Sequence, residues 1–166
     1  MINKSFIQRN LLILDKKYKN ASLQQDCLFF SKLAILELCG WIEESIDLMV
    51  TDLASKKIKN SSNLKIINQA IKRNYGFDYD KHFRNLLIQL IGLINFEKLE
   101  SKMDSSKLQL LISSLETLTQ IRNSLAHTHI KGVTTQINSP SITLSQFSNV
   151  YNGLKEAEKA LRSIKI

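Results

Sequence analysis

Apolar residues recur every three or four positions along most of the chain, the spacing that places them on one face of an α-helix. This pattern predicts five long helices and a shorter third one. One proline and five glycines are too few to punctuate many short strands. We therefore expect an all-α fold, an antiparallel bundle of five to six helices in a single domain covering residues 1–166. The expected helices cover residues 3–19, 22–57, 64–75, 81–102, 104–127 and 143–166.

Short polar motifs mark the positions where these helices are expected to begin. Ser22 is followed three residues later by Gln25, and Thr143 by Gln146, so each pair has the spacing of a capping box. Gly76 suits the end of the third helix, because glycine readily adopts the conformation found after a helix C-terminus. The other candidate caps are Ser61, Ser62, Asp78, Asp80, Asp104 and Ser105.

Residues 132–142 interrupt the helical pattern. Residues 133–137 alternate between apolar and polar side chains, as an extended strand does. Residues 138–141, with the sequence Asn-Ser-Pro-Ser, are typical of a turn. We expect a short hairpin or an ordered loop here, beside the end of the fifth helix.

The chain carries a formal charge of +8 and has a pI near 9.5. A basic surface favours a polyanionic partner such as nucleic acid, although membranes attract such surfaces too. The longest apolar stretch, residues 86–94, is far shorter than the roughly 20 residues that span a bilayer. The N-terminus also lacks the apolar segment of a signal peptide. These features favour a nucleic-acid partner and no membrane.

The two cysteines, Cys27 and Cys39, fall in one expected helix. Their separation of twelve residues corresponds to roughly 18 Å of helical rise. They therefore cannot form a disulfide with each other, and a reducing cytoplasm is the expected location.

The candidate chemistry lies in residues 121–129, which hold two of the three histidines and one of the five arginines. Asn123 and His127 are four residues apart and share a helix face, whereas Arg122 and His127 point about 140° apart. Three arrangements would bring Arg122 and His127 together. The long arginine side chain can bend, the helix can end near His127, or a second copy of the chain can supply the missing group.

The second expected helix carries several acidic residues. Glu37 and Glu44 are two turns apart and share a face with Trp41. Acidic residues on a helix usually face water. The alternative is that Glu37 or Glu44 lies inside the bundle and holds Arg122, and the spacing does not choose between the two.

The motif Arg122-Asn123-x-x-x-His127, near a helix end in a small all-helical chain, resembles the signature of the HEPN (higher eukaryotes and prokaryotes nucleotide-binding) superfamily. That signature is an Arg, often followed by a polar residue, and a His four to six positions after the Arg. Residues 34–45 also resemble the second helix of HEPN toxins, in which an acidic residue often pairs with the motif Arg. HEPN proteins partnered with small nucleotidyltransferases tend to have Tyr where this chain has His129, so control by such a partner is less expected.

The resemblance implies a metal-independent endoribonuclease, without cofactor, that acts as a toxin or in bacterial antiphage defence. It implies RNA as substrate, a homodimer with a composite active site, and an antitoxin or defence-system partner. The expected products are a 2′,3′-cyclic phosphate and a 5′-OH. The alternative is a non-catalytic helical module that binds nucleotide, RNA or a partner protein.

The residue types agree with this chemistry. Histidine titrates near neutrality and suits proton transfer, so His127 is the candidate acid or base. Arg122 can hold two phosphate oxygens at once, and Asn123 can orient the histidine ring or donate to phosphate. His129 is a supporting neighbour, and Lys131 is a candidate phosphate contact. A metal site built from His127, His129 and an aspartate has too few ligands at a recognised spacing.

Overall fold

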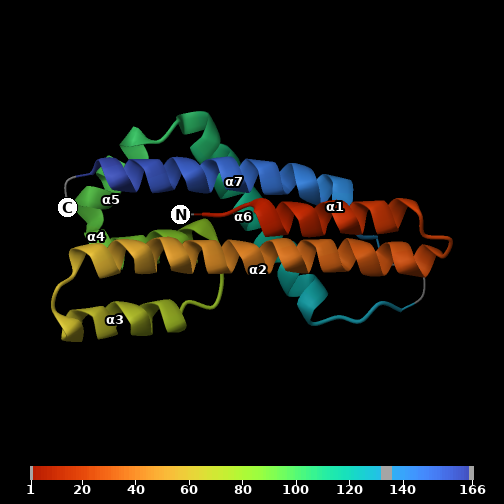
Figure 1. Cartoon of the computed structure of the whole chain (residues 1–166), viewed down its shortest axis with the longest axis horizontal. Coiled ribbons are helices and arrows are strands. Elements are labelled where there is room, and N and C mark those ends of the chain that lie inside the picture. The colour runs from red at the N-terminus through yellow and green to blue at the C-terminus, as the bar shows by residue number, and fades with distance from the viewer. Residues whose placement is uncertain (1, 132–135, 165–166) are drawn as a thin grey trace.

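The computed structural model describes residues 2–131 and 136–164. Within these residues the chain forms seven α-helices and one short π-helical turn, η1, and contains no strand (Figure 1). The expectation of an all-α fold is confirmed. The elements are α1 (Ser5–Lys19), α2 (Gln24–Lys57), α3 (Ser61–Lys72), η1 (Tyr79–Arg84), α4 (Asn85–Ile91), α5 (Leu93–Lys102), α6 (Ser105–Ala126) and α7 (Pro140–Ser163).

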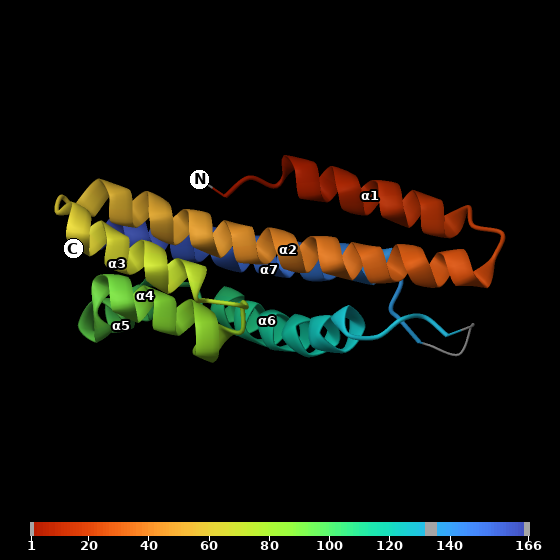
Figure 2. The ribbon, with the colours of Figure 1, turned by 90° about the horizontal axis from the view of Figure 1, so that it is seen from below.

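The longest helix, α2, is the axis of the bundle and contains 34 residues. Figure 1 shows α1 and α7 running along one side of α2, and Figure 2 shows α3, α4 and α6 on another. All five of these helices contact α2. A helix surrounded in this way buries residues on several faces, and α2 accordingly lacks a single apolar stripe.

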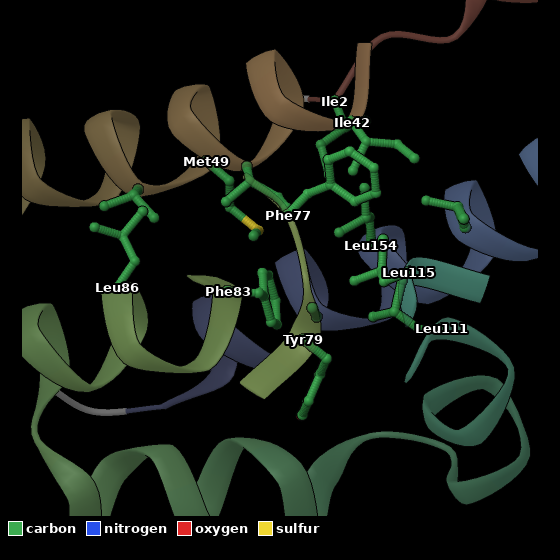
Figure 3. Close-up of a cluster of buried hydrophobic side chains, with 14 of the residues drawn as sticks. Ile2, Ile42, Met49, Phe77, Tyr79, Phe83, Leu86, Leu111, Leu115 and Leu154 are labelled. Carbon is green, nitrogen blue, oxygen red and sulfur yellow. The ribbon is translucent and has the colours of Figure 1, made fainter. Parts of the chain in front are cut away.

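One cluster of buried apolar side chains connects the helices (Figure 3). Ile42 comes from α2, Leu154 from α7, and Phe77 and Phe83 from the segment that leads into α4. Both phenylalanines are completely buried, and burial of such a side chain stabilises a fold by about 1.5–3 kcal/mol. Phe77 therefore fixes the loop before η1 against the core.

The expected helix over residues 81–102 is instead three elements: η1, α4 and α5. The break between α4 and α5 falls at Gly92, whose φ of 76° and ψ of 158° suit glycine and strain other residues. At the start of η1, the Asp78 carboxylate accepts from the backbone N–H of Lys81 (2.9 Å), which confirms the expected capping acid. In the part of the chain that the structure describes, seven α-helices therefore replace the expected five to six.

Both of the expected capping boxes are wrong. α2 begins at Gln24 without a side-chain cap, so Ser22 does not cap it. α7 begins at Pro140, because proline suits the first turn of a helix, and Thr143 is buried inside that helix. In the segment expected to form a hairpin or ordered loop, residues 136–139 have no regular structure, and residues 132–135 lie outside the described residues.

Two other helix starts have side-chain caps. Asp104 caps α6 by accepting from the backbone N–H of Lys107 (3.0 Å), as expected. The cap of α3 is Asn60, which accepts from the N–H groups of Ser62 and Asn63, so the expected serine caps are wrong. Asn60 takes this role because its short amide reaches the first free N–H groups of the helix.

Candidate functional site at the end of helix α6

The C-terminal end of α6 carries the arginine–histidine motif. The helix ends at Ala126, and His127 is its C-cap residue. The Thr128 hydroxyl donates to the carbonyl of Ser124 (2.7 Å), and Lys32 of α2 donates to the carbonyl of Thr128 (2.5 Å). These bonds satisfy carbonyl groups at the helix end and fix it to α2. The expectation that the helix ends near His127 is confirmed.

Arg122 points toward α2 and is held there by three groups. Its guanidinium donates to the Glu43 carboxylate and to the side-chain oxygen of Asn123 (3.2 Å). The guanidinium carbon also lies 5.6 Å from the centre of the Phe77 ring, within the range of cation–π attraction. The Arg122 side chain is 26% exposed, so it remains reachable from solvent while these contacts fix its position.

The carboxylate that pairs with Arg122 is Glu43, and the expectation of Glu37 or Glu44 is wrong. Glu37 and Glu44 do share a face of α2, as their spacing indicated, but this face adjoins α1. Glu37 accepts from the amide of Asn10 in α1 (3.2 Å), and Glu44 lines the same groove. Glu43 lies 100° around the helix from Glu44, and this rotation brings it to α6.

A second acidic residue, Asp47, lies one turn beyond Glu43 on α2. Burial, and then the negative charge of Glu43, raises the pKa of Asp47 to about 6. One turn before Glu43, burial raises the pKa of the Cys39 thiol to about 12; the positive charge of Arg122 opposes this rise and Glu43 adds to it. The thiol is therefore neutral near pH 7, whereas the Asp47 carboxyl changes its charge near pH 6.

His127 is exposed and lines an open pocket of about 530 Å³ at the end of α6. His129, Lys131 and Lys32 line the same pocket. Among the described residues that line it, none is acidic. Two imidazoles and two ammonium groups around one open pocket favour an anionic ligand, and the volume is in the range of small-molecule sites.

The structure does not bring Arg122 and His127 together within one chain. Arg122 is not among the residues that line the His127 pocket, and its guanidinium faces Glu43 instead. Asn123 belongs with the arginine, because its side-chain oxygen accepts from Arg122. The motif therefore presents its cation and its imidazole on different sides of the end of α6.

Sequence reasoning missed three residues of this site: Lys32, Glu43 and Asp47. For the two acids a signal existed, since Cys39, Glu43 and Asp47 follow one another at intervals of four residues and so share a face of α2. For Lys32 no signal existed, because it meets Thr128 across 96 residues of chain.

In residues 2–131 and 136–164, no three His, Cys, Asp or Glu side chains are grouped so that they could hold a metal ion. Over the same residues, no helix is both long enough and apolar enough to cross a membrane. Comparison with models of protein families, with curated protein sequences and with solved structures gives no significant match.

Proposed function

We propose that this protein is a metal-independent endoribonuclease of the HEPN type. The observation that carries the proposal is the arrangement at the end of α6. His127 is exposed there on a basic pocket, and Arg122, about one and a half turns before it in the same helix, is held by Glu43 of α2. An imidazole, a fixed guanidinium and nearby ammonium groups are the side chains that RNA cleavage without metal requires.

In the proposed reaction, the 2′-oxygen of a ribose attacks the adjacent phosphorus, and the bond from phosphorus to the 5′-oxygen breaks. One His127 accepts the proton of the 2′-OH, and a second His127 gives a proton to the leaving 5′-oxygen. Arg122 stabilises the additional negative charge on the phosphate. The products are a 2′,3′-cyclic phosphate and a 5′-OH. Lys131 and Lys32 contribute positive charge at the edge of the pocket.

The proposed active form is a homodimer. One chain offers a single His127, whereas the reaction uses both an acid and a base. Within one chain Arg122 also faces α2 rather than the His127 pocket. Two copies related by a two-fold axis would supply two histidines and two arginines to one composite site. The proposed setting is bacterial antiphage defence or a toxin system in the cytoplasm, with an antitoxin or defence protein as a further partner.

A second candidate function is a non-catalytic helical module that binds nucleotide, RNA or a partner protein. The observation that favours it is that Arg122 already has partners in its own chain, namely Glu43, Asn123 and the Phe77 ring. A motif arginine satisfied in this way stabilises the contact between α2 and α6 without any substrate.

The test is cleavage of a structured RNA by the purified full-length protein in excess EDTA, with chemical identification of the new ends. We expect cyclic phosphate and 5′-OH ends. His127→Ala and Arg122→Ala should each reduce the rate by at least about 100-fold, because each removes a group that acts in the transition state.

Two variants serve as matched controls. Arg9→Ala removes an exposed arginine on α1, and His129→Ala removes the neighbouring imidazole. Each should change the cleavage rate by less than about fivefold, because neither group acts on the reacting atoms. If the folded wild type cuts none of several RNAs, or if both motif variants still cut, the module is the better description.

A further inference from the structure

A second pocket, of about 520 Å³, lies between α3 and the segment formed by η1 and α4. This region follows the end of α2, whereas the His127 pocket adjoins Lys32 near the start of α2 (Figure 2). Neither Arg122 nor His127 lines the second pocket, so the proposed nuclease chemistry does not use it. Its volume is in the range of sites that bind ligands of nucleotide size.

Two cations line the pocket from two different elements. Arg73 follows the end of α3, and Lys81 belongs to η1. None of the residues that line the pocket is acidic. The two aspartates nearest in sequence are engaged elsewhere: Asp78 caps η1, and Asp80 pairs with Arg84 (3.4 Å). Among the described residues, no carboxylate therefore forms an ion pair with Arg73 or Lys81.

The positive charge of the whole chain is concentrated in this region. Residues 56–96, which include α3, η1 and α4, hold eight Lys or Arg and two Asp residues. Their net charge of +6 compares with +8 for the full chain, although they are about a quarter of its length. An anion approaching the protein is therefore attracted toward this pocket.

The remaining lining residues suit a flat polar ring. Gln69, Asn74, Asn85 and Gln89 supply amide groups, which both donate and accept hydrogen bonds. The amide nitrogen of Asn85 donates to the carbonyl of Lys81 (3.0 Å), which leaves its side-chain oxygen free to accept. Ile66 is 63% exposed at the edge of the pocket and offers an apolar surface against which a base can pack.

The position of Lys81 depends on an uncommon backbone conformation. η1 is a π-helical turn, and such turns are rare and frequently occur at functional sites. Two anchors fix it: the buried Phe83, and the hydroxyl of Tyr79, which donates to Glu100 of α5 (2.8 Å). The exposed Lys81 is therefore held on a rigid turn rather than on a loop.

We propose that this second pocket binds one nucleotide unit, with Arg73 and Lys81 on its phosphate and the amides on the edge of its base. The unit is either a free nucleotide or one nucleotide of an RNA chain. The proposal is independent of the nuclease, because it uses none of the residues at the end of α6.

The experiment measures binding to the full-length protein by calorimetry and by fluorescence anisotropy. One arm uses the four ribonucleoside 5′-monophosphates and 5′-triphosphates. The other uses a labelled RNA of twelve nucleotides with 2′-O-methyl riboses, which the proposed cleavage cannot cut. We expect saturable binding in at least one arm. The double variant Arg73→Ala/Lys81→Ala should weaken it at least about 20-fold, because it removes two charge-assisted contacts.

The matched control is Lys65→Ala/Lys72→Ala, which removes the same charge from exposed positions of α3 that do not line the pocket. It should weaken binding by less than about threefold, since only the general field changes. Binding of mononucleotides identifies a free nucleotide as the ligand, and binding of the oligonucleotide alone identifies a unit of RNA. The proposal is overturned by no saturable binding in either arm, or by equal losses in both double variants with native circular dichroism.

Discussion

Cys39, Glu43 and Asp47 follow one another at intervals of four residues along α2, and Glu43 pairs with Arg122. Burial disfavours the charged form of a carboxylate, and a second carboxylate one turn away adds to this effect. Of these two carboxylates, Glu43 pairs directly with Arg122 and Asp47 does not. This explains why the pKa of Asp47 is raised to about 6. The Glu43 carboxylate that holds Arg122 therefore also affects the protonation of Asp47, one turn away on α2.

The raised pKa of Asp47 predicts a pH-dependent stability. The ordinary value is 3.8 and the folded value about 6, so between these the folded state binds more protons than the unfolded state. The free energy of unfolding therefore falls as the pH rises from about 4 to about 6, and stays lowered above that. A difference of about two pKa units corresponds to about 3 kcal/mol, which solvent screening of this partly exposed side chain reduces to about 1 kcal/mol.

Asp47→Asn should accordingly raise the free energy of unfolding by about 1 kcal/mol at pH 7.5 and have little effect at pH 4. Urea denaturation at the two pH values measures this. Glu44→Gln, on the face of α2 that adjoins α1, is the control and should stay within about 0.5 kcal/mol of the wild type at both. Equal effects of Asp47→Asn at pH 4 and 7.5 would show that ionisation is not the cause.

At the scale of the helices, the contact between α6 and α7 depends on a glycine. A Cβ atom added at Gly153 of α7 would lie 2.6 Å from the Cβ of Leu111 in α6, closer than packed carbon atoms approach. Leu111 is completely buried, so it has little room to move. This close packing fixes α6, and with it the helix end that carries the motif.

Gly153→Ala should therefore lower the free energy of unfolding by about 1–3 kcal/mol, as overpacking of a core does. Gly40→Ala is the matched control, because Gly40 lies within α2 and a Cβ added there would have no atom of another helix within 4 Å. It should raise the stability by about 0.5–1 kcal/mol, since alanine favours the helix. Thermal or urea denaturation of both variants measures the contrast, and effects of the same sign would show that the close contact does not limit packing.

At the scale of the whole molecule, two pockets with basic lining residues lie near different ends of α2. The His127 pocket adjoins the start of α2, and the pocket between α3 and α4 follows its end. Our two proposals give these regions separate roles, cleavage at one and binding of a nucleotide unit at the other. Both regions are basic, as expected of a chain with a charge of +8.

The proposed composite site predicts how wild-type and inactive chains combine. If one site needs His127 from both chains, a dimer with one His127→Ala chain is inactive. After full exchange in an equal mixture, about one quarter of the dimers are wild type on both sides, so the cleavage activity should be about one quarter of that of wild type alone at the same total concentration. Activity of about one half would mean that each chain acts independently.

The sequence by itself determined the fold class and part of the local structure, because these depend on neighbouring residues. The helical period of apolar side chains, the capping role of Asp104 and the end of a helix near His127 are all properties of short segments. The same local reasoning showed that Glu37 and Glu44 share a face of α2. It could not show which helix that face meets, because this depends on packing between segments distant in sequence.

Tertiary structure alone decided the features that join distant segments. The pairing of Glu43 with Arg122 spans 79 residues, and the contact of Lys32 with the end of α6 spans 96. Both follow from the rotation of α2 about its axis, where a step of one residue turns a side chain by 100°. The break at Gly92 and the start of α7 at Pro140 were not predicted from the periodicity of apolar residues, because that periodicity does not report the backbone preferences of glycine and proline.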